Sequence, residues 1–186
     1  MPYKDSGILT PAPKGLHRTA GALDEPVDLN NVVAMAVAIT DNLIRRSTTN
    51  FRVDYGAPMP LIRGSAQQLE QVIINLIANA CQSLNSNSGE VRIKTYSSRE
   101  TNEVGVVVKD SGSGIRESDL KYIMDPFFTT KRDRGGTGLG LSVSNNIVKS
   151  HGGLLVLTSE PNRGTKAKVS LPVLQSQTTD GAQPRR

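Results

Sequence analysis

Hydrophobic side chains follow a helical spacing in the first part of the chain. Between residues 27 and 46 they recur three and four positions apart, which is typical of an amphipathic helix. Asp28 or Asn30 can accept hydrogen bonds from the first free N–H groups of this helix. Residues 50–56 then alternate between polar and apolar side chains, and this alternation predicts a short strand.

The most regular apolar stripe lies on residues 65–84 and predicts the strongest helix of the chain. Ser65 is a good N-cap residue, and Gln68 follows it three positions later, as in a capping box. Cys81 falls within the apolar pattern, so we expect it to be a small buried hydrophobic residue rather than a nucleophile.

The second half of the chain mixes strand and helix patterns. Two β-rich runs around a polar turn predict an antiparallel pair, and a later pair predicts a hairpin around the turn PNRG. The predicted strands are 90–97, 103–110, 154–160 and 165–173, and the predicted helices are 117–124 and a segment from the glycine-rich run to about Ser150, ended by Gly152 and Gly153. The mixture predicts an α+β fold, a two-layer sandwich in which helices cover one face of a mixed sheet.

Length and composition limit the chain to one ordinary domain with tails. Its 186 residues are 37% hydrophobic, which is enough for one core. Proline, glycine and polar residues dominate 1–25 and 175–186, so we expect flexible tails there and the domain over 26–174. No apolar run can span a bilayer, and a single cysteine fits a reducing compartment, so we expect a cytoplasmic location.

The net charge of +5 raises the question of a nucleic-acid partner. The basic residues, however, are spread over different predicted elements and do not cluster with aromatic residues; they include Arg45, Arg52, Arg63, Arg92 and Lys94. We therefore expect no nucleic-acid partner. The charge can instead aid solubility or attract a polyphosphate or an acidic partner.

Two asparagines stand beside the apolar stripe of the predicted helix 65–84. Asn75 and Asn79 are four positions apart and share one face, where an unpaired amide is costly. Both amides can simply bond neighbouring loops at the edge of the core. Alternatively, one of them can offer its carbonyl oxygen to a hard cation such as Mg²⁺.

Asp110 ends a predicted strand and is followed by Gly112 and Gly114. This pattern is typical of an ordinary turn. It also fits a binding site, because a carboxylate held in a partly apolar pocket can accept a hydrogen bond from an exocyclic amine. The small glycines would let a flat ring approach the backbone.

The segment 126–140 brings aromatic, basic and glycine residues together before a helix. Pro126 and two phenylalanines can anchor a loop whose remainder, TTKRDRGG, has the composition of a mobile basic lid. The glycines of TGLGLS leave backbone N–H groups open at the start of the helix, where phosphate can bind. The spacing is neither that of a P-loop nor that of a dinucleotide-binding fingerprint.

The ordered series NLIANA, DSGSGI, DPFFTTK, GGTGLGLS and NRGT resembles the N, G1, F, G2 and G3 boxes of the sensor histidine kinase ATP-binding domain. That family belongs to the Bergerat-fold group, with gyrase, the Hsp90 chaperones and MutL. The resemblance covers residues 26–173, and FFTTK followed by GTGLGL looks most like the nitrogen-regulation kinases. It implies a mixed, mostly antiparallel sheet with helices on one face, and Mg²⁺ and ATP as cofactors.

Carried over residue by residue, the resemblance implies three catalytic residues: Asn79 as the Mg²⁺ ligand, Asn75 as its polar neighbour on the phosphate side, and Lys131 as a phosphate counter-charge. Many members have Lys or Arg where this chain has Gln82, which shifts charge neutralisation onto Lys131, Arg132 or Arg134. The implied nucleotide-binding residues are Asp110 at the adenine amino group, Gly112, Gly114 and Ile115 around the base, Thr165 on the adenine side, and Thr130, Gly136, Gly138, Leu139 and Gly140 around the phosphates.

The reaction class depends on Asn75. ATPases of the Bergerat group have a glutamate four residues before the metal-binding asparagine as general base, and a neutral amide cannot accept that proton. We therefore expect phosphoryl transfer to a partner protein rather than hydrolysis. The alternatives are a Bergerat-type ATPase, an anti-sigma-factor-like Ser/Thr kinase, or a nucleotide-gated protein-binding module.

The histidines of the chain do not match a phosphoacceptor site. His17 is flanked by glycines, and His151 precedes two glycines at a helix end, where a C-terminal role is expected. The segment ILTPAPKG is similar to the exit from the dimerisation helices of relatives. The resemblance thus implies a monomeric catalytic module whose partners are ATP or ADP, a His-containing dimerisation domain and a response-regulator receiver domain. Any membrane contact would pass through other parts of the parent protein.

Overall fold

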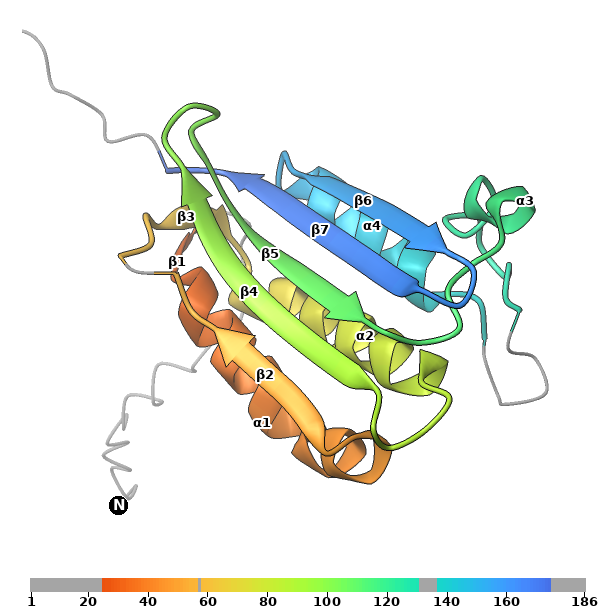
Figure 1. Cartoon of the computed structure of the whole chain (residues 1–186). Helices are drawn as coiled ribbons and strands as arrows, with labels where there is room; N and C mark the ends of the chain where they lie inside the picture. The colour runs from red at the N-terminus through yellow and green to blue at the C-terminus, as the bar shows by residue number, and fades with distance from the viewer. Residues whose placement is uncertain (1–24, 57, 131–136, 175–186) are drawn as a thin grey trace, which may run out of the picture.

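The computed structural model describes residues 25–56, 58–130 and 137–174. A five-stranded sheet in the order β2-β4-β5-β7-β6 forms one layer, and the helices α1, α2 and α4 cover one of its faces (Figure 1). The elements are β1 Glu25–Val27, α1 Leu29–Ser47, β2 Asn50–Asp54, β3 Ile62–Gly64, α2 Ala66–Ser83, β4 Glu90–Ser98, β5 Glu103–Asp110, α3 Glu117–Leu120, α4 Gly140–Ser150, β6 Leu154–Glu160 and β7 Gly164–Pro172.

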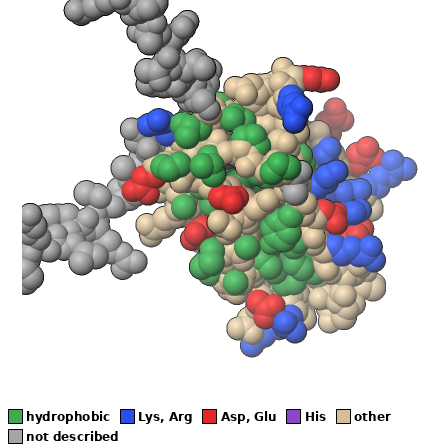
Figure 2. Space-filling view, turned by 90° about the vertical axis from the view of Figure 1, so that its left-hand side faces the viewer, with side chains coloured by type: hydrophobic (Ala, Val, Ile, Leu, Met, Phe, Trp, Pro, Cys, Tyr) green, Lys and Arg blue, Asp and Glu red, His purple; other side chains and the backbone are tan. Residues whose placement is uncertain are grey.

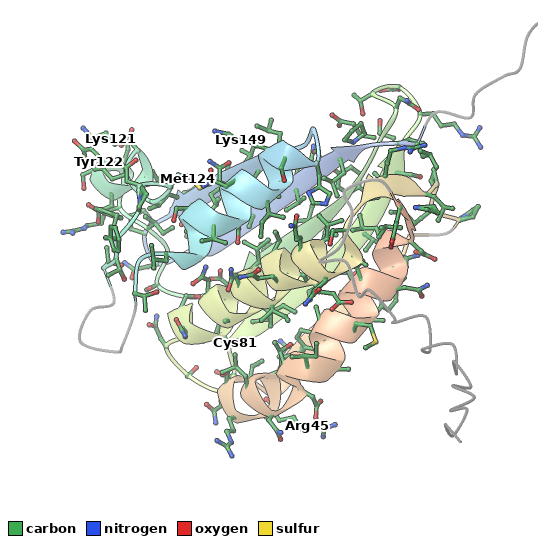
Figure 3. All side chains as sticks on the ribbon, turned by 180° about the vertical axis from the view of Figure 1, so that it is seen from behind. Arg45, Cys81, Lys121, Tyr122, Met124 and Lys149 are labelled. Atoms are coloured by element: carbon green, nitrogen blue, oxygen red, sulfur yellow. The ribbon has the colours of Figure 1, made fainter. Side chains whose placement is uncertain are left out.

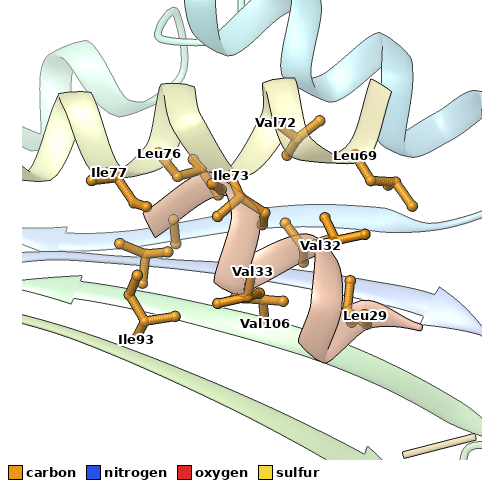
Figure 4. Packing of buried hydrophobic residues seen from close by; sticks show 14 of the residues in the cluster. Leu29, Val32, Val33, Leu69, Val72, Ile73, Leu76, Ile77, Ile93 and Val106 are labelled. Atoms are coloured by element: carbon orange, nitrogen blue, oxygen red, sulfur yellow. The ribbon is translucent and has the colours of Figure 1, made fainter. Parts of the chain in front are cut away.

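The sheet is mixed and mostly antiparallel, as predicted. Strand β2 runs parallel to β4, whereas β4, β5, β7 and β6 pair antiparallel in that order. The inward side chains of these strands meet the helices in one core, in which Ile93 and Val106 lie against residues of α1 and α2 such as Val33 and Ile77 (Figure 4). The predicted α+β sandwich is therefore confirmed.

The helix caps show which local signals operate. Asp28 accepts hydrogen bonds from the N–H groups of Asn30 and Asn31, so it caps α1. Ser65 caps α2 through the N–H of Gln68. The backbone N–H of Ser65 donates to His151 Nε2 at 3.0 Å, which is the bond that the Gln68 side chain would accept in a complete capping box. The start of α2 is thus completed by a residue 86 positions away.

The structure adds one element that the sequence pattern does not show. Strands β1 and β3 pair antiparallel as a small two-stranded sheet, with Glu25 opposite Gly64. Three-residue strands are too short to display an alternating pattern. β1 begins one residue before the predicted domain start, and the rest of both predicted tails lies outside the described residues. None of the described helices is both long enough and apolar enough to cross a membrane.

Candidate nucleotide-binding site

A cavity of about 590 Å³ opens between α2, the start of α4 and one end of the sheet. This volume is within the range of small-molecule and cofactor sites. Helices α2 and α4 lie side by side over the sheet (Figure 3). The sheet contributes inward-facing residues of β5, β6 and β7, and the loop after α3 contributes Phe128, Thr129 and Thr130.

Asp110 is the acidic residue among the described residues that line the cavity. It is only 5% exposed, and its Oδ1 accepts three hydrogen bonds, from the Ser83 hydroxyl and the N–H groups of Gly112 and Thr165. Donors from three segments thus hold one carboxylate oxygen in place. This arrangement holds the carboxylate at the cavity wall.

Two tight backbone contacts support Asp110. Gly164 has a φ of +87°, and a Cβ there would overlap the carbonyl oxygen of Asp110. Gly114 has a φ of +67°, and a Cβ there would overlap the carbonyl oxygen of Glu160. Only glycine fits both conditions without strain. The loop after β5 and the turn between β6 and β7 are therefore locked together around the carboxylate.

Ser159 completes this end of the cavity. Its hydroxyl donates to the Gly164 carbonyl and accepts from the N–H of Ile115, at 2.8 and 2.9 Å, and it lies 2.9 Å from the Thr165 hydroxyl. Because Ser159 uses its own proton on Gly164, the Thr165 hydroxyl is the donor in that pair. The Thr165 oxygen keeps acceptor capacity toward the cavity wall it lines.

The opposite end of the cavity is formed by the start of α4. Leu139 is the N-cap residue, and among the described residues no side-chain hydrogen bond caps the start of this helix. The Asn75 side-chain amide donates to the Gly140 carbonyl and to the Ser144 hydroxyl, both at 3.3 Å, and so joins α2 to α4. Helix starts with open N–H groups favour anions, so this end can receive phosphate.

Asn79 lines the cavity one turn after Asn75, so the two asparagines share the predicted face. Among the described residues, no group of three or more His, Cys, Asp or Glu side chains could hold a metal ion. A cation here would therefore take its protein oxygen from an amide such as that of Asn79. Mg²⁺ accepts such a set, because it commonly binds one or two protein oxygens together with water and substrate phosphates.

The rim beside the start of α4 is apolar and exposed. The Phe127 N–H donates to the Gly138 carbonyl at 3.0 Å, which places Phe127 next to Leu139. Tyr122 packs against Phe128 with ring centroids 5.9 Å apart, and Figure 3 labels Tyr122 in this part of the molecule. The side chains of Phe127, Tyr122 and Leu139 are 67%, 45% and 37% exposed. We call these three residues, two aromatic and one aliphatic, the aromatic rim.

Most of the predicted site residues that the structure describes lie together. Those lining the cavity are Asn75, Asn79, Asp110, Gly114, Ile115, Thr130, Gly138, Gly140 and Thr165. Gly112 and Leu139 are not in the lining, because Gly112 packs behind the wall against Ser83 and Leu139 stands exposed at the helix start. Lys131 and Gly136, and with them the predicted lid, lie outside the described residues.

Sequence reasoning missed Ser83, Ser159 and Phe128. Ser83 and Ser159 act through contacts with residues 27 and 44 positions away, which no local pattern reveals. Phe128 lines the cavity, whereas the sequence suggested only that it anchors the loop. Gln82 also lines the cavity, so the side chain that replaces the usual Lys or Arg faces the site.

Cys81 of α2 is buried, as predicted, and its thiol contacts Ser47 of α1. Burial raises the pKa of its thiol, a hydrogen bond with Ser47 acts in the opposite direction, and the charge of Asp110 raises it further. A thiol held in its neutral form is a poor nucleophile. Cys81 is therefore a packing residue.

Comparison with known proteins identifies the family of the chain. The family model described as histidine kinase-, DNA gyrase B-, and HSP90-like ATPase matches residues 64–175. The two-component sensor PprA of Pseudomonas aeruginosa is 45% identical over 117 residues, covering 61% of this chain and 13% of that protein. Sporulation kinase A of Bacillus subtilis is 37% identical over 151 residues, covering 81% of this chain and 24% of that kinase. The chain thus spans a small part of these relatives.

Solved structures show the same fold. The catalytic domain of histidine kinase ThkA is 28% identical, with a TM-score of 0.70 over 81% of this chain and 95% of that domain. Full-length ShkA in complex with AMPPNP has a TM-score of 0.71 at 20% identity, over 82% of this chain and 32% of ShkA, and it supports the fold alone. The chain belongs to the histidine kinase-, DNA gyrase B- and HSP90-like ATPase family, as an ATP-binding catalytic domain of the sensor histidine kinase class.

Proposed function

We propose that this domain binds Mg²⁺·ATP and transfers the γ-phosphoryl group to a histidine on a helical dimerisation domain of its parent protein. The observation that carries the proposal is the lack of a general base among the described residues of the cavity. Asp110 is the acidic residue in the described lining, and three hydrogen bonds hold it at the end of the cavity opposite the start of α4, so it is not placed to act as that base. Asn75 is neutral and uses its amide protons on α4. Water activation is therefore disfavoured, and transfer to an incoming nucleophile is favoured.

The geometry supports one orientation of the nucleotide. Asp110 would accept a hydrogen bond from the adenine amino group, with Thr165 beside it. The triphosphate would extend toward Gly138 and Gly140 at the start of α4, where open N–H groups favour anions. Asn79 would supply an oxygen ligand to Mg²⁺, which contributes charge neutralisation around the phosphates when bound.

No Lys or Arg occurs among the described residues that line the cavity. Phosphoryl transfer needs positive charge near the γ-phosphate in addition to the metal. We assign this charge to Lys131, Arg132 or Arg134, which precede the start of α4 in the sequence. Asn75 acts here as a positioning residue, because it ties the phosphate-binding helix to α2.

The aromatic rim is the docking surface for the dimerisation domain in this proposal. Exposed apolar residues at the mouth of a site are typical of a protein-interaction surface. Phe127 and Leu139 stand next to the predicted phosphate end, so a helix docked on them would bring its histidine to the γ-phosphate. The phosphoryl group would then pass to an aspartate of a receiver domain, and because ATP is the donor we place the reaction in the cytoplasm.

The test is transfer of label from γ-radiolabelled ATP to the helical His-containing domain of the parent protein, supplied as a separate chain. We expect acid-labile label on that domain, with little free phosphate. Phe127→Ala should lower transfer and leave ATP affinity unchanged, whereas Ile39→Ala, an exposed residue of α1, should change neither. Steady phosphate release by this chain alone would favour the ATPase alternative. Absence of label with the intact parent protein would overturn the proposal.

A further inference from the structure

The sheet face opposite the helices carries a concentration of basic side chains. Of the five basic residues named as scattered along the sequence, strand pairing brings Arg52, Arg92 and Lys94 together, which corrects that expectation in part. Six exposed side chains from four neighbouring strands form this surface, which we call the basic sheet face: Arg52, Arg92, Lys94, Lys109, Lys166 and Lys168. The right-hand side of Figure 2 shows this face edge-on, with blue side chains along it and red ones among them.

Four of these residues are direct cross-strand neighbours. Arg52 pairs with Arg92, Arg92 with Lys109, and Lys109 with Lys166, so one row of positive charge crosses β2, β4, β5 and β7. Neighbouring strands lie about 4.8 Å apart, and like charges directly opposite each other destabilise a sheet. Arg92 alone of this row has an ion pair among the described residues, with Asp54 at 2.7 Å. The repulsion between these like charges destabilises the sheet and contributes nothing to its packing.

Apolar side chains extend the basic sheet face at its β6 edge. Leu154 and Val156 are 57% and 41% exposed and are cross-strand neighbours of Ser170 and Lys168. They therefore point to the same side of the sheet as the basic row. The Lys168 ammonium group lies over the Tyr96 ring, 5.2 Å from its centroid, which keeps Tyr96 covered.

We propose that the basic sheet face docks on the surface of an anionic lipid bilayer, with Leu154 and Val156 entering the headgroup region. On this face the six basic side chains outnumber the acidic ones, which are Asp54, Glu90, Glu103 and Glu160. A surface with excess positive charge and apolar residues at its edge fits a plane of negative headgroups. Protein interfaces are depleted in lysine and enriched in exposed aromatic residues, which this face lacks. Nucleic-acid recognition needs stacking rings or an element that enters a groove, and the one ring here is covered by Lys168.

This orientation leaves the nucleotide site accessible. The cavity is lined by α2, by the start of α4 and by the inward face of the sheet, all on the opposite side from the basic sheet face. ATP and a helical partner could therefore reach the cavity and the aromatic rim while the sheet faces the bilayer. The proposal replaces the expectation that membrane contact passes only through other parts of the parent protein, and it does not depend on the proposed kinase activity.

The test is co-sedimentation of the full chain with vesicles of phosphatidylcholine alone or with about one-third phosphatidylserine. The double variant K109Q/K166Q removes two charges from the basic row. Each basic side chain near an anionic surface raises the binding constant by about fivefold. Removing two of them should therefore weaken vesicle binding by about thirtyfold. The matched control is R46Q/K149Q, which removes two exposed charges from the helical side and should change binding little.

A folding readout separates binding from damage. Because K109Q/K166Q removes a like-charge contact, its thermal unfolding midpoint should equal or exceed that of the native chain. Equal binding to both kinds of vesicle, or equal losses in the two double variants, would overturn the proposal. Tighter binding to a DNA duplex than to the anionic vesicles would also overturn it, in favour of a nucleic-acid partner.

Discussion

The two ends of the cavity are built in different ways. Around Asp110 the chain supplies nearly everything, with three hydrogen bonds on one carboxylate oxygen and glycine contacts that admit no Cβ. At the start of α4 none of the described side chains caps the helix, and the tight contact there is that of Gly138, whose φ is +70° and where a Cβ would overlap the Phe127 backbone. A Cβ on Gly140 would make only ordinary contacts with Asn75, the nearest at 3.8 Å.

This difference indicates that the two ends of the cavity have different functions. The Asp110 end is preorganised, so it can select a base without rearrangement, and preorganisation reduces the entropy lost on binding. Under the proposed function, the α4 end would be completed by the phosphates of the nucleotide and by Mg²⁺. Substitutions at the first end should therefore damage the fold or the selection of the base, whereas a substitution at Gly140, where a Cβ has room, should affect phosphate binding alone.

The largest effect is expected for Gly164→Ala. The added Cβ would overlap the Asp110 carbonyl, and alanine disfavours the φ of +87° found there. We expect the free energy of unfolding to fall by about 2 kcal/mol or more, as for other strained backbone positions. Urea denaturation measures this loss. A variant as stable as the native chain would contradict the preorganised Asp110 end.

Asp110→Asn should lower ATP affinity by about tenfold to a hundredfold, because a hydrogen bond to a charged group contributes more than a neutral one. Asparagine keeps an oxygen for the three donors, so the fold should persist. Calorimetric titration measures the affinity. The control Ser83→Ala removes one of the three donors but keeps the charge, so it should lower ATP affinity less. Equal ATP affinity in the native chain and in Asp110→Asn would contradict adenine recognition at this end.

Gly140→Ala tests the α4 end, where we expect ligand affinity to change and stability to be kept. The Cβ has room, and alanine favours helix, so stability should be unchanged or raised. ATP affinity should fall about tenfold, because a methyl group would crowd one phosphate contact, while adenosine affinity should stay the same. Paired thermal unfolding and titration distinguish the two quantities. Loss of adenosine binding in this variant would contradict the division between the ends.

The smallest effect concerns the buried Cys81. Burial raises the pKa of the folded thiol, so the folded chain keeps this proton to higher pH than the unfolded chain. The resulting stability is present at neutral pH and is lost as the pH rises toward the folded pKa. Unfolding measured across alkaline pH should show a shallower decline for Cys81→Ala. Asp110→Asn should lower the thiol pKa, because the charge of Asp110 raises it, and thiol reaction rates would report that shift.

The sequence predicts the long elements well because their signals are local. The stripe of α2 and its Ser65 cap lie within one segment, and so do the alternating strands β4 and β5. These features depend on neighbours along the chain, which a sequence displays directly. The residues that line the cavity, by contrast, are predicted through the family resemblance that the ordered motifs carry.

Features created by long-range pairing are not visible in this way. His151 is predicted only to end a helix, yet its Nε2 accepts from Ser65 and its Nδ1 contacts the Ile147 carbonyl, so it joins the end of α4 to the start of α2. The basic sheet face likewise exists only through strand register. Asn75 is predicted beside the phosphates, and its actual partners, Gly140 and Ser144, follow from helix packing.

The most direct test is calorimetric titration of the native chain with adenosine and with ATP, each with and without Mg²⁺, while phosphate release is followed in parallel. The account predicts that adenosine binds equally well with and without Mg²⁺, that Mg²⁺ raises the affinity for ATP, and that phosphate release is negligible. Binding of ATP that ignores Mg²⁺, or steady phosphate release by the domain alone, would contradict it.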